Sequence, residues 1–328
     1  MKKLLFSLLG LFVVLLGGWL GASWWIGKQT ETFVREQLIK PQENSVLPAG
    51  LKQEVVSYER SLFSSTAVTK LVLDNPLLKG MAEEIQLKHY IQHGPILLGN
   101  GIHLGSSNWT TTLDTSKLPE ASQNWLKEAF ANKEPGKLKT AIGFGGNANY
   151  HFQLHPLISN GGTDGVNLKI TDLVTDGAIK PKGEMSPGTF SMKGFELRDN
   201  NVTFTIPDVK AEGKTDVHSS LGLGNVNIKA PNVQILTAGS TEPISLDMTV
   251  TTDIREVGKS LQGNLAFNAN NVKGPGAEVK SAALKVDYSG FNVEESKQWS
   301  RLWTSKLQET AKGRKHIWEE QLAQVGLK

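Results

Sequence analysis

Hydrophobic and polar residues alternate along most of the chain between about residue 51 and residue 290. Tyr150, Phe152 and Leu154 are one such run, and residues 244–250 are another, with Ile, Leu, Met and Val at every second position. A period of two places the apolar side chains on one face of a β-strand and the polar side chains on the other. The pattern predicts a mainly β (α+β) fold, built as a large curled antiparallel sheet or an elongated β domain with one apolar face.

Glycine and proline divide this region into short extended runs. The first four predicted strands are residues 51–58, 65–73, 84–91 and 96–104. Asn, Asp and Gly residues separate many of the later runs, and such residues favour tight turns. We therefore expect hairpins that connect strands adjacent in the sequence.

Three segments have helical rather than alternating spacing. They are residues 28–40, which Pro41 ends, residues 118–132, and residues 293–325. The last segment predicts a long amphipathic helix with apolar positions that include Trp299 and Leu302. This helix either docks on the sheet or binds a membrane surface or a partner protein.

The first 27 residues differ from the rest of the chain. Residues 4–26 form a 23-residue stretch without a charge, and a helix of this length spans about 30 Å of hydrocarbon. Lys2 and Lys3 precede it, which favours a cytoplasmic N-terminus, and tryptophans near its far end suit a membrane interface. The residues expected in this anchor are Leu4, Leu5, Phe6, Leu11, Phe12, Val13, Val14, Leu15, Leu16, Trp19, Leu20, Trp24 and Trp25.

This stretch predicts a single-pass helix, residues 1–27, in a bacterial inner membrane. Residues 28–328 are then a β-rich domain in the periplasm. The alternative is a cleaved signal peptide, because Gly21, Ala22 and Ser23 are small enough for a processing site. The apolar stretch is longer than the usual core of a signal, which favours the anchor.

Charge and cysteine content exclude several classes of partner and of chemical site. The chain has 35 basic and 32 acidic residues, spread without a basic block, so nucleic acid is not an expected partner. It has no cysteine, which excludes disulfides, thiolate nucleophiles and cysteine-ligated zinc.

The motifs that could carry chemistry favour structural interpretations. Residues 143–148, GFGGNA, resemble a dinucleotide fingerprint, but a strand pattern follows where a helix is required, so a turn or bulge is predicted. His89 and His93, and likewise His151 and His155, are four residues apart in extended segments. Four residues on a strand separate side chains by about 13 Å, too far to share one zinc ion. No nucleophile motif is present, and we expect neither an enzyme nor a metal or cofactor site.

A series of short motifs runs through the chain in a recognisable order. After the N-terminal anchor come Tyr58-Glu59-Arg60, Phe63-Ser64-Ser65, His93-Gly94-Pro95, Ile142-Gly143-Phe144-Gly145-Gly146 and the late Trp299. Together they resemble the YdgA-like family of bacterial envelope proteins of unknown function. We interpret the motifs as structural: Phe63-Ser64-Ser65 as a turn that leads into a strand, and Gly94-Pro95 as the end of one.

The resemblance implies an inner-membrane anchor, a periplasmic β-rich domain and no assigned catalytic residues. Members of the family continue past the late helix, so the chain is expected to be a shortened version or a piece. The family is also distantly similar to the AsmA-like envelope proteins, which are thought to conduct lipids. The first hypothesis is therefore a non-catalytic protein that binds lipid or other hydrophobic cargo. The alternatives are a structural protein that binds another envelope protein, and an envelope hydrolase.

Overall fold

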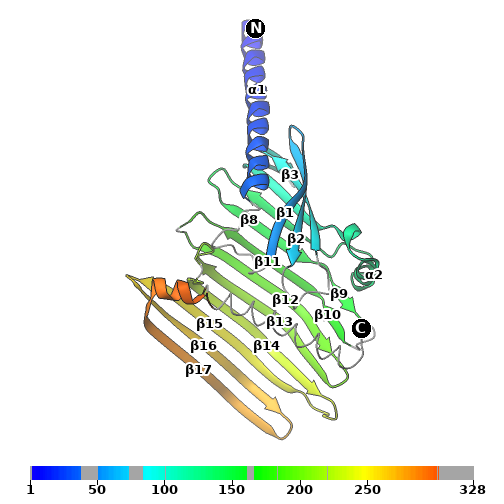
Figure 1. The fold of residues 1–328 in the computed structure, drawn as a ribbon, viewed down its shortest axis with the longest axis vertical. Helices are drawn as coiled ribbons and strands as arrows, with labels where there is room; N and C mark the ends of the chain where they lie inside the picture. The colour runs from blue at the N-terminus through cyan, green and yellow to red at the C-terminus, as the bar shows by residue number, and fades with distance from the viewer. Residues whose placement is uncertain are drawn as a thin grey trace.

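The computed structural model describes residues 2–37, 51–73, 84–99, 101–160, 166–182, 184–219, 221–300 and 302. These residues form one 15-stranded antiparallel sheet, a separate two-stranded hairpin and a few helices (Figure 1). The main path of the large sheet runs β1-β2-β3-β6-β7-β8-β11-β12-β13-β14-β15-β16-β17, while β9 and β10 pair beside β12. The expected mainly β fold with an antiparallel sheet is confirmed.

The strands are of uneven length up to β10 and lengthen from 8 residues in β11 to 16 in β17. The first eight are β1 (Leu51–Arg60), β2 (Ser64–Leu73), β3 (Glu84–His93), β4 (Ile96–Gly99), β5 (Gly101–Leu104), β6 (Ser107–Leu113), β7 (Gly136–Ile142) and β8 (Ala148–Leu154). The remaining nine are β9 (Leu157–Ser159), β10 (Asn167–Ile170), β11 (Asp172–Ile179), β12 (Ser186–Arg198), β13 (Val202–Thr215), β14 (Gly224–Thr237), β15 (Ile244–Val257), β16 (Ser260–Gly274) and β17 (Ala277–Asn292). From β11 onward, consecutive strands pair as hairpins, as the turn residues predicted.

The first three predicted strands are confirmed within a few residues, but the fourth is wrong. Residues 96–104 form the hairpin β4-β5 instead of one strand. The sequence contained a signal for a hairpin here, because Asn-Gly, the pair at positions 100 and 101, is typical of tight turns between strands.

Cross-strand pairing gathers the apolar side chains of the later strands on one face, which we call the apolar face. Ile244, Leu246, Met248 and Val250 of β15 each belong to a different row across the sheet. The Val250 row is Phe190, Ala211, Ile228, Val250, Phe267 and Leu284. The Met248 row is Ala230, Met248, Ala269 and Ala282. The Ile244 row is Leu168, Leu197, Phe204, Ile235 and Ile244.

Two bulges interrupt the pairing of β14 and β16 with β15. Asn232 and Asn271 have φ of 53° and 51° there, a left-handed conformation that asparagine tolerates better than most residues. Asp247 of β15 lies between them: its Oδ1 accepts the backbone N–H of Asn232 at 2.8 Å, and its Oδ2 accepts Nδ2 of Asn271 at 2.7 Å. One carboxylate therefore stabilises both irregularities.

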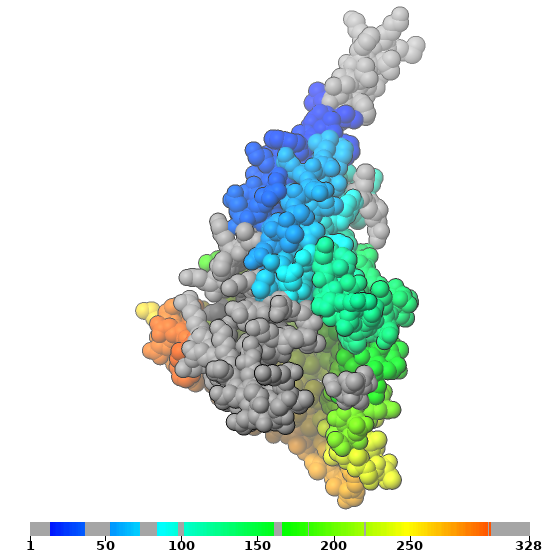
Figure 2. All heavy atoms as spheres, turned by 45° about the vertical axis from the view of Figure 1, so that its right-hand side comes forward, coloured from blue at the N-terminus to red at the C-terminus, as the bar shows by residue number. Residues whose placement is uncertain are grey.

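The long helix α1 (Lys2–Thr32) continues into a π-helical turn, Phe33–Gln37. The helix predicted over 28–40 is not a separate element, because residues 28–32 belong to α1 and residues 33–37 form the π-helical turn. Residues 38–40 lie outside the described part. The end of this helix packs on the first strands, where Val34 joins Tyr58, Ala67 and Ile91 in a buried cluster. Figure 1 shows α1 leaving the sheet at one end of the molecule, and in Figure 2 the last turns of the helix lie against the first strands.

Of the two other predicted helices, the one over 118–132 is shorter in the structure, and the one over 293–325 is described only at its start. A 3₁₀ turn, Thr115–Lys117, precedes α2 (Glu120–Ala129), and Asp114 caps the turn rather than the helix. Ala129 and Phe130 pack with Leu157 in a second small core. A helix also begins at Val293, but most of the predicted segment 293–325 lies outside the described residues.

Candidate functional site

The junction between α1 and the sheet brings together several of the short motifs that lie far apart in the sequence. Ser23 is fully buried, and its Oγ donates a hydrogen bond of 2.7 Å to the carbonyl of Gly94. One helical turn further, a Cβ at Gly27 would lie 2.6 Å from Nδ1 of His93. The helix can approach β3 this closely because position 27 has no side chain.

His93 lies in the centre of this junction and is only 2% exposed. Its Nε2 shares a hydrogen bond of 2.9 Å with Oγ of Ser65, and its Nδ1 lies 3.4 Å from the carbonyl oxygen of Leu62. Burial lowers the pKa of His93, against the raising effect of the Leu62 carbonyl. A neutral imidazole therefore joins two strands and supports the helix.

His89 points from the same face of β3, two positions beyond Ile91. Its Nε2 and Nδ1 lie 2.7 Å from Oγ1 of Thr69 and 2.9 Å from Oγ1 of Thr111. Burial lowers the pKa of His89 from 6.5 to about 4. Both ring nitrogens are occupied by threonine hydroxyls, so this histidine connects β2, β3 and β6.

Backbone hydrogen bonds connect the loops around the junction. The N–H of His93 donates to the carbonyl of Phe63, that of Gly94 to Ser106, and that of Ser106 to Ile142, at 2.7–2.8 Å. Phe63-Ser64-Ser65, His93-Gly94-Pro95 and the turn that starts at Gly143 thus meet at one end of the sheet. The turn that leads into β2, the strand end at Gly94-Pro95 and the turn at Gly143 are all confirmed.

Trp299 is the one motif residue outside this junction. It lies in the helix that follows β17, at the opposite edge of the sheet from β1, and is 66% exposed. The motifs therefore do not all serve one site.

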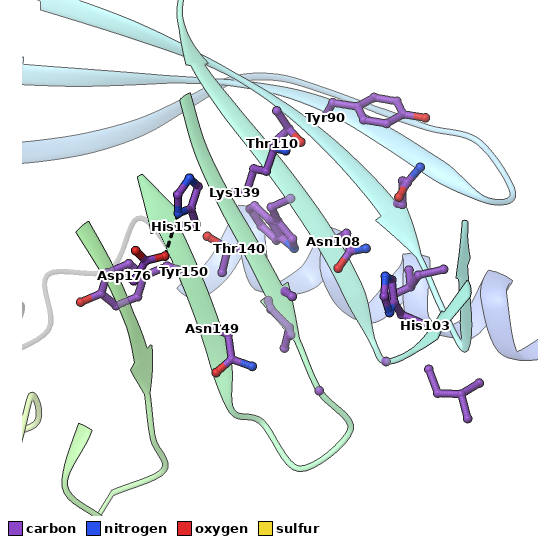
Figure 3. A pocket seen from close by; sticks show the side chains of 18 of the residues that line it. Tyr90, His103, Asn108, Thr110, Lys139, Thr140, Asn149, Tyr150, His151 and Asp176 are labelled. Atoms are coloured by element: carbon purple, nitrogen blue, oxygen red, sulfur yellow. Dashed lines mark hydrogen bonds and ion pairs between the residues drawn. The ribbon is translucent and has the colours of Figure 1, made fainter. Parts of the chain in front are cut away.

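A cavity of about 750 Å³ lies on the polar face of the sheet, beside the β4-β5 hairpin (Figure 3). Its polar lining includes Tyr90, Asn108, Lys139, Asn149, His151 and Asp176. Tyr90, Thr110, Lys139, His151 and Asp176 are neighbours in one row across five strands. The polar side chains that line this cavity are therefore those that the alternating pattern places on the polar face of the sheet.

His151 and Asp176 form the one ion pair among these lining residues, with Nδ1 and Oδ1 2.7 Å apart. Such a pair orients the imidazole in hydrolases, where Nε2 then contacts a nucleophilic hydroxyl. Within the described part of the chain, no hydroxyl group hydrogen-bonds Nε2 of His151. Both side chains are also about half exposed, so the pair by itself does not constitute a catalytic site.

The apolar face offers a different kind of surface. In its interior the side chains are partly covered, whereas towards the last strand they become exposed, with Leu284 at 60% and Val286 at 43%. A smaller hollow of about 210 Å³ lies where Gly188 and Gly213 remove side chains from one row, between Tyr150, Phe190 and Val226. This surface suits apolar ligands rather than polar substrates.

The residues predicted to form the anchor all fall in α1. Val14, Leu15, Leu16, Trp24 and Trp25 are exposed, with Val14 at 70%. Trp19 stacks on Phe63 with ring centroids 4.9 Å apart, and Leu20 is half-buried. The side chains of Leu4, Leu5, Phe6, Leu11, Phe12 and Val13 lie outside the described residues. Within the described part of the chain, no helix is both long enough and apolar enough to cross a membrane.

Sequence reasoning missed the partners of the motif residues. Ser23 and Gly27 looked like small residues of an apolar helix, and no motif indicated which strand they contact. The only signal was the combination of a small residue and a glycine four positions apart on one helical face.

Comparison with known proteins agrees with the motifs. A family model described as "Bacterial protein of unknown function (DUF945)" matches residues 1–326. Protein YdgA of Escherichia coli (strain K12) is 22% identical over 320 residues, which cover 91% of this chain and 62% of YdgA. The chain thus spans less than two thirds of the length of that relative. No solved structure matches. The chain belongs to the DUF945 family of bacterial proteins.

Proposed function

We propose that this protein is a non-catalytic component of the bacterial cell envelope that binds lipid or other hydrophobic cargo on its apolar face. In this proposal α1 anchors the chain in the inner membrane, and the sheet lies in the periplasm. The observation that carries the proposal is the continuity of the apolar face, because its rows cross up to six strands without a polar interruption.

The exposure of apolar side chains on the last strands favours a ligand-binding role over a purely structural one. Leu265, Leu284 and Val286 on β16 and β17 are between 42% and 60% exposed. Each exposed apolar side chain of this size forgoes about 1–2 kcal/mol of burial free energy. A contiguous surface of this kind is typical of a binding site.

The anchoring half of the proposal rests on the first residues of the chain. Residues 4–26 carry no charge, and Lys2 and Lys3 precede them. In the described part of α1, Val14 and Leu15 are exposed on a helix that extends away from the sheet (Figure 1). A solvated helix would not favour such residues, whereas a lipid environment would.

Site-specific photocrosslinking in cells tests the cargo. A benzophenone amino acid at Phe267 or Leu284 samples the apolar face, and the matched positions Asn268 and Lys285 sample the polar face of the same strands. Both pairs lie on β16 and β17, far from α1 (Figure 1), so lipid around the helix does not contribute. We expect lipid adducts at Phe267 and Leu284 and few at the matched positions.

Two other outcomes would contradict the lipid proposal. A protein adduct at Phe267 and Leu284 would favour the alternative, a structural protein whose apolar face binds another envelope protein. Equal labelling of both faces would show that the apolar face is not a specific surface. Fractionation of the intact chain tests the anchor separately, since recovery in the soluble fraction would exclude it.

A further inference from the structure

Exposed apolar side chains lie on two loops and one hairpin at the end of the sheet from which α1 leaves. They are Leu62 and Phe63 between β1 and β2, Ile102 and Leu104 in β5, and Phe144 between β7 and β8. We call these five residues the loop-tip cluster. Ile102 and Leu104 are each 75% exposed and Phe144 is 64% exposed, which is unusual for side chains that elsewhere form cores.

The loop-tip cluster is held in place by the backbone around the helix junction. The N–H of Gly105 donates to the carbonyl of Pro95 at 3.1 Å, and the N–H of Ser106 donates to that of Ile142 at 2.8 Å. Phe63 stacks on Trp19 of α1. The three tips are therefore ordered relative to one another and to the helix.

If α1 crosses the membrane as proposed above, the position of the helix sets the depth of these loops relative to the bilayer. A bilayer core of about 30 Å needs about 20 helical residues. Counted from Leu4, the core would end at Ser23, which is bonded to Gly94 inside the junction. The uncharged stretch of α1 thus overlaps the part of the helix that is docked on the sheet, and the loops around Ser23 lie at the membrane boundary.

Basic and aromatic side chains lie close to Ser23, near the proposed membrane boundary. Nζ of Lys28 lies 5.7 Å from the ring centroid of Trp24, and the guanidinium of Arg60 lies 5.6 Å from it. Tryptophan, lysine and arginine at the ends of an apolar helix are the residues that contact lipid headgroups. Arg60 also directly precedes the turn that carries Leu62 and Phe63.

We propose that the loop-tip cluster enters the interfacial layer of the same membrane that holds α1, so that the sheet rests on the bilayer instead of hanging from a flexible tether. The occupant is lipid, because the tips continue the apolar surface of α1 and are flanked by cations. This contact orients the strands and brings the polar cavity beside Leu104 next to the headgroups. The proposal rests on the proposed anchoring, and the experiment below separates the two.

The absence of cysteine makes single-site labelling straightforward. Full-length Ile102→Cys, Phe144→Cys, Leu15→Cys and Val279→Cys are labelled with the environment-sensitive fluorophore NBD and reconstituted in phosphatidylethanolamine–phosphatidylglycerol vesicles. Nitroxide-labelled lipids then report contact with the bilayer. Val279 is the control for exposure without membrane contact, because it is 48% exposed and lies beside the β16-β17 turn, far from α1 (Figure 1).

We expect blue-shifted emission at Ile102 and Phe144, with several-fold stronger quenching by the nitroxide lipids than at Val279. Labels at Ile102 and Phe144 that behave like Val279, while Leu15 is quenched, would overturn the loop proposal and leave the anchor intact. Labels shielded from water but not quenched by lipid would indicate a protein partner and would also overturn it. Quenching at Ile102 and Phe144 without quenching at Leu15 would contradict the anchor, and it would overturn this proposal too, because the loops would then contact a membrane that α1 does not cross.

Discussion

His93 and Gly27 are in such close contact that any side chain at position 27 would collide with the imidazole. An added Cβ would lie 2.6 Å from Nδ1 and 2.7 Å from Cε1 of His93. The imidazole cannot move away easily, because it is buried and Ser65 holds its other nitrogen. The pair therefore fixes where α1 docks on the sheet.

Gly27→Ala is expected to destabilise this junction by about 1–3 kcal/mol, the usual cost of overpacking a buried contact. Gly21→Ala is the matched control, since no atom lies within 4 Å of its added Cβ; alanine should there stabilise the helix slightly. Chemical unfolding of the detergent-solubilised variants measures both. A His93→Ala background should remove most of the penalty at position 27, and equal effects of the two glycine substitutions would refute the contact.

Mild acid is expected to destabilise the sheet through His89. The unfolded chain binds a proton near pH 6.5, whereas burial holds the pKa of folded His89 at about 4. Between these values the unfolded state binds more protons, so the free energy of unfolding falls as the pH decreases from 6.5 to 4, by up to about 3 kcal/mol. The lowered pKa of His93 adds a change of the same sign.

Unfolding curves between pH 7.5 and pH 4.5 test this dependence in the wild type and in His89→Gln. Glutamine can still bond the two threonines but does not titrate. We expect the variant to be less stable at pH 7.5 and to lose a large part of the pH dependence. An unchanged slope would mean that the pKa of His89 is not lowered by folding.

Asp247→Ala should loosen the two bulges beside β15. It removes the acceptor of both Asn232 N–H and Asn271 Nδ2, and hydrogen bonds to a charged acceptor are stronger than average. We expect the Tm to fall by a few degrees. Asp287→Ala, which removes only an exposed contact with Lys285, should leave the Tm nearly unchanged; similar shifts for both would argue against a specific role of Asp247.

The two faces of the sheet should respond differently to a charge. Val250→Asp places a carboxylate in the centre of the apolar face and is expected to cost about 2 kcal/mol or more. Thr251→Asp, one residue further on the polar face, should change stability by less than about 0.5 kcal/mol. Thermal unfolding of the two variants is a direct comparison, and equal effects would show that the faces are not distinct.

Much of the fold follows from local pattern. Alternation in residues 244–250 identified both the strand and the face to which Ile244, Leu246, Met248 and Val250 belong, because the pleat of a strand has a period of two. The helix over 118–132 was predicted for a similar reason. Its start was displaced, since Asp114 caps a short 3₁₀ turn that the periodicity does not resolve.

Other features depended on context. The prediction of a separate helix after residue 27 was wrong because helical spacing does not show whether one helix continues into the next. Gly27 lies inside α1 and allows its close contact with His93. The prediction of a single strand over 96–104 was wrong because apolar residues lie on both sides of Asn100-Gly101, so the hairpin resembles one continuous apolar strand. In both cases glycine had a local meaning that only its neighbours in space decide.

The sequence alone determined that the strands have one apolar and one polar face and that residues 4–26 form an uncharged apolar stretch, because these are properties of neighbouring residues. Only the tertiary structure decided that Ser23, Gly27, Phe63, His93 and Ile142 surround one junction. Their contacts join segments up to 71 residues apart. Strand order across the sheet, which no local period encodes, brings these segments together.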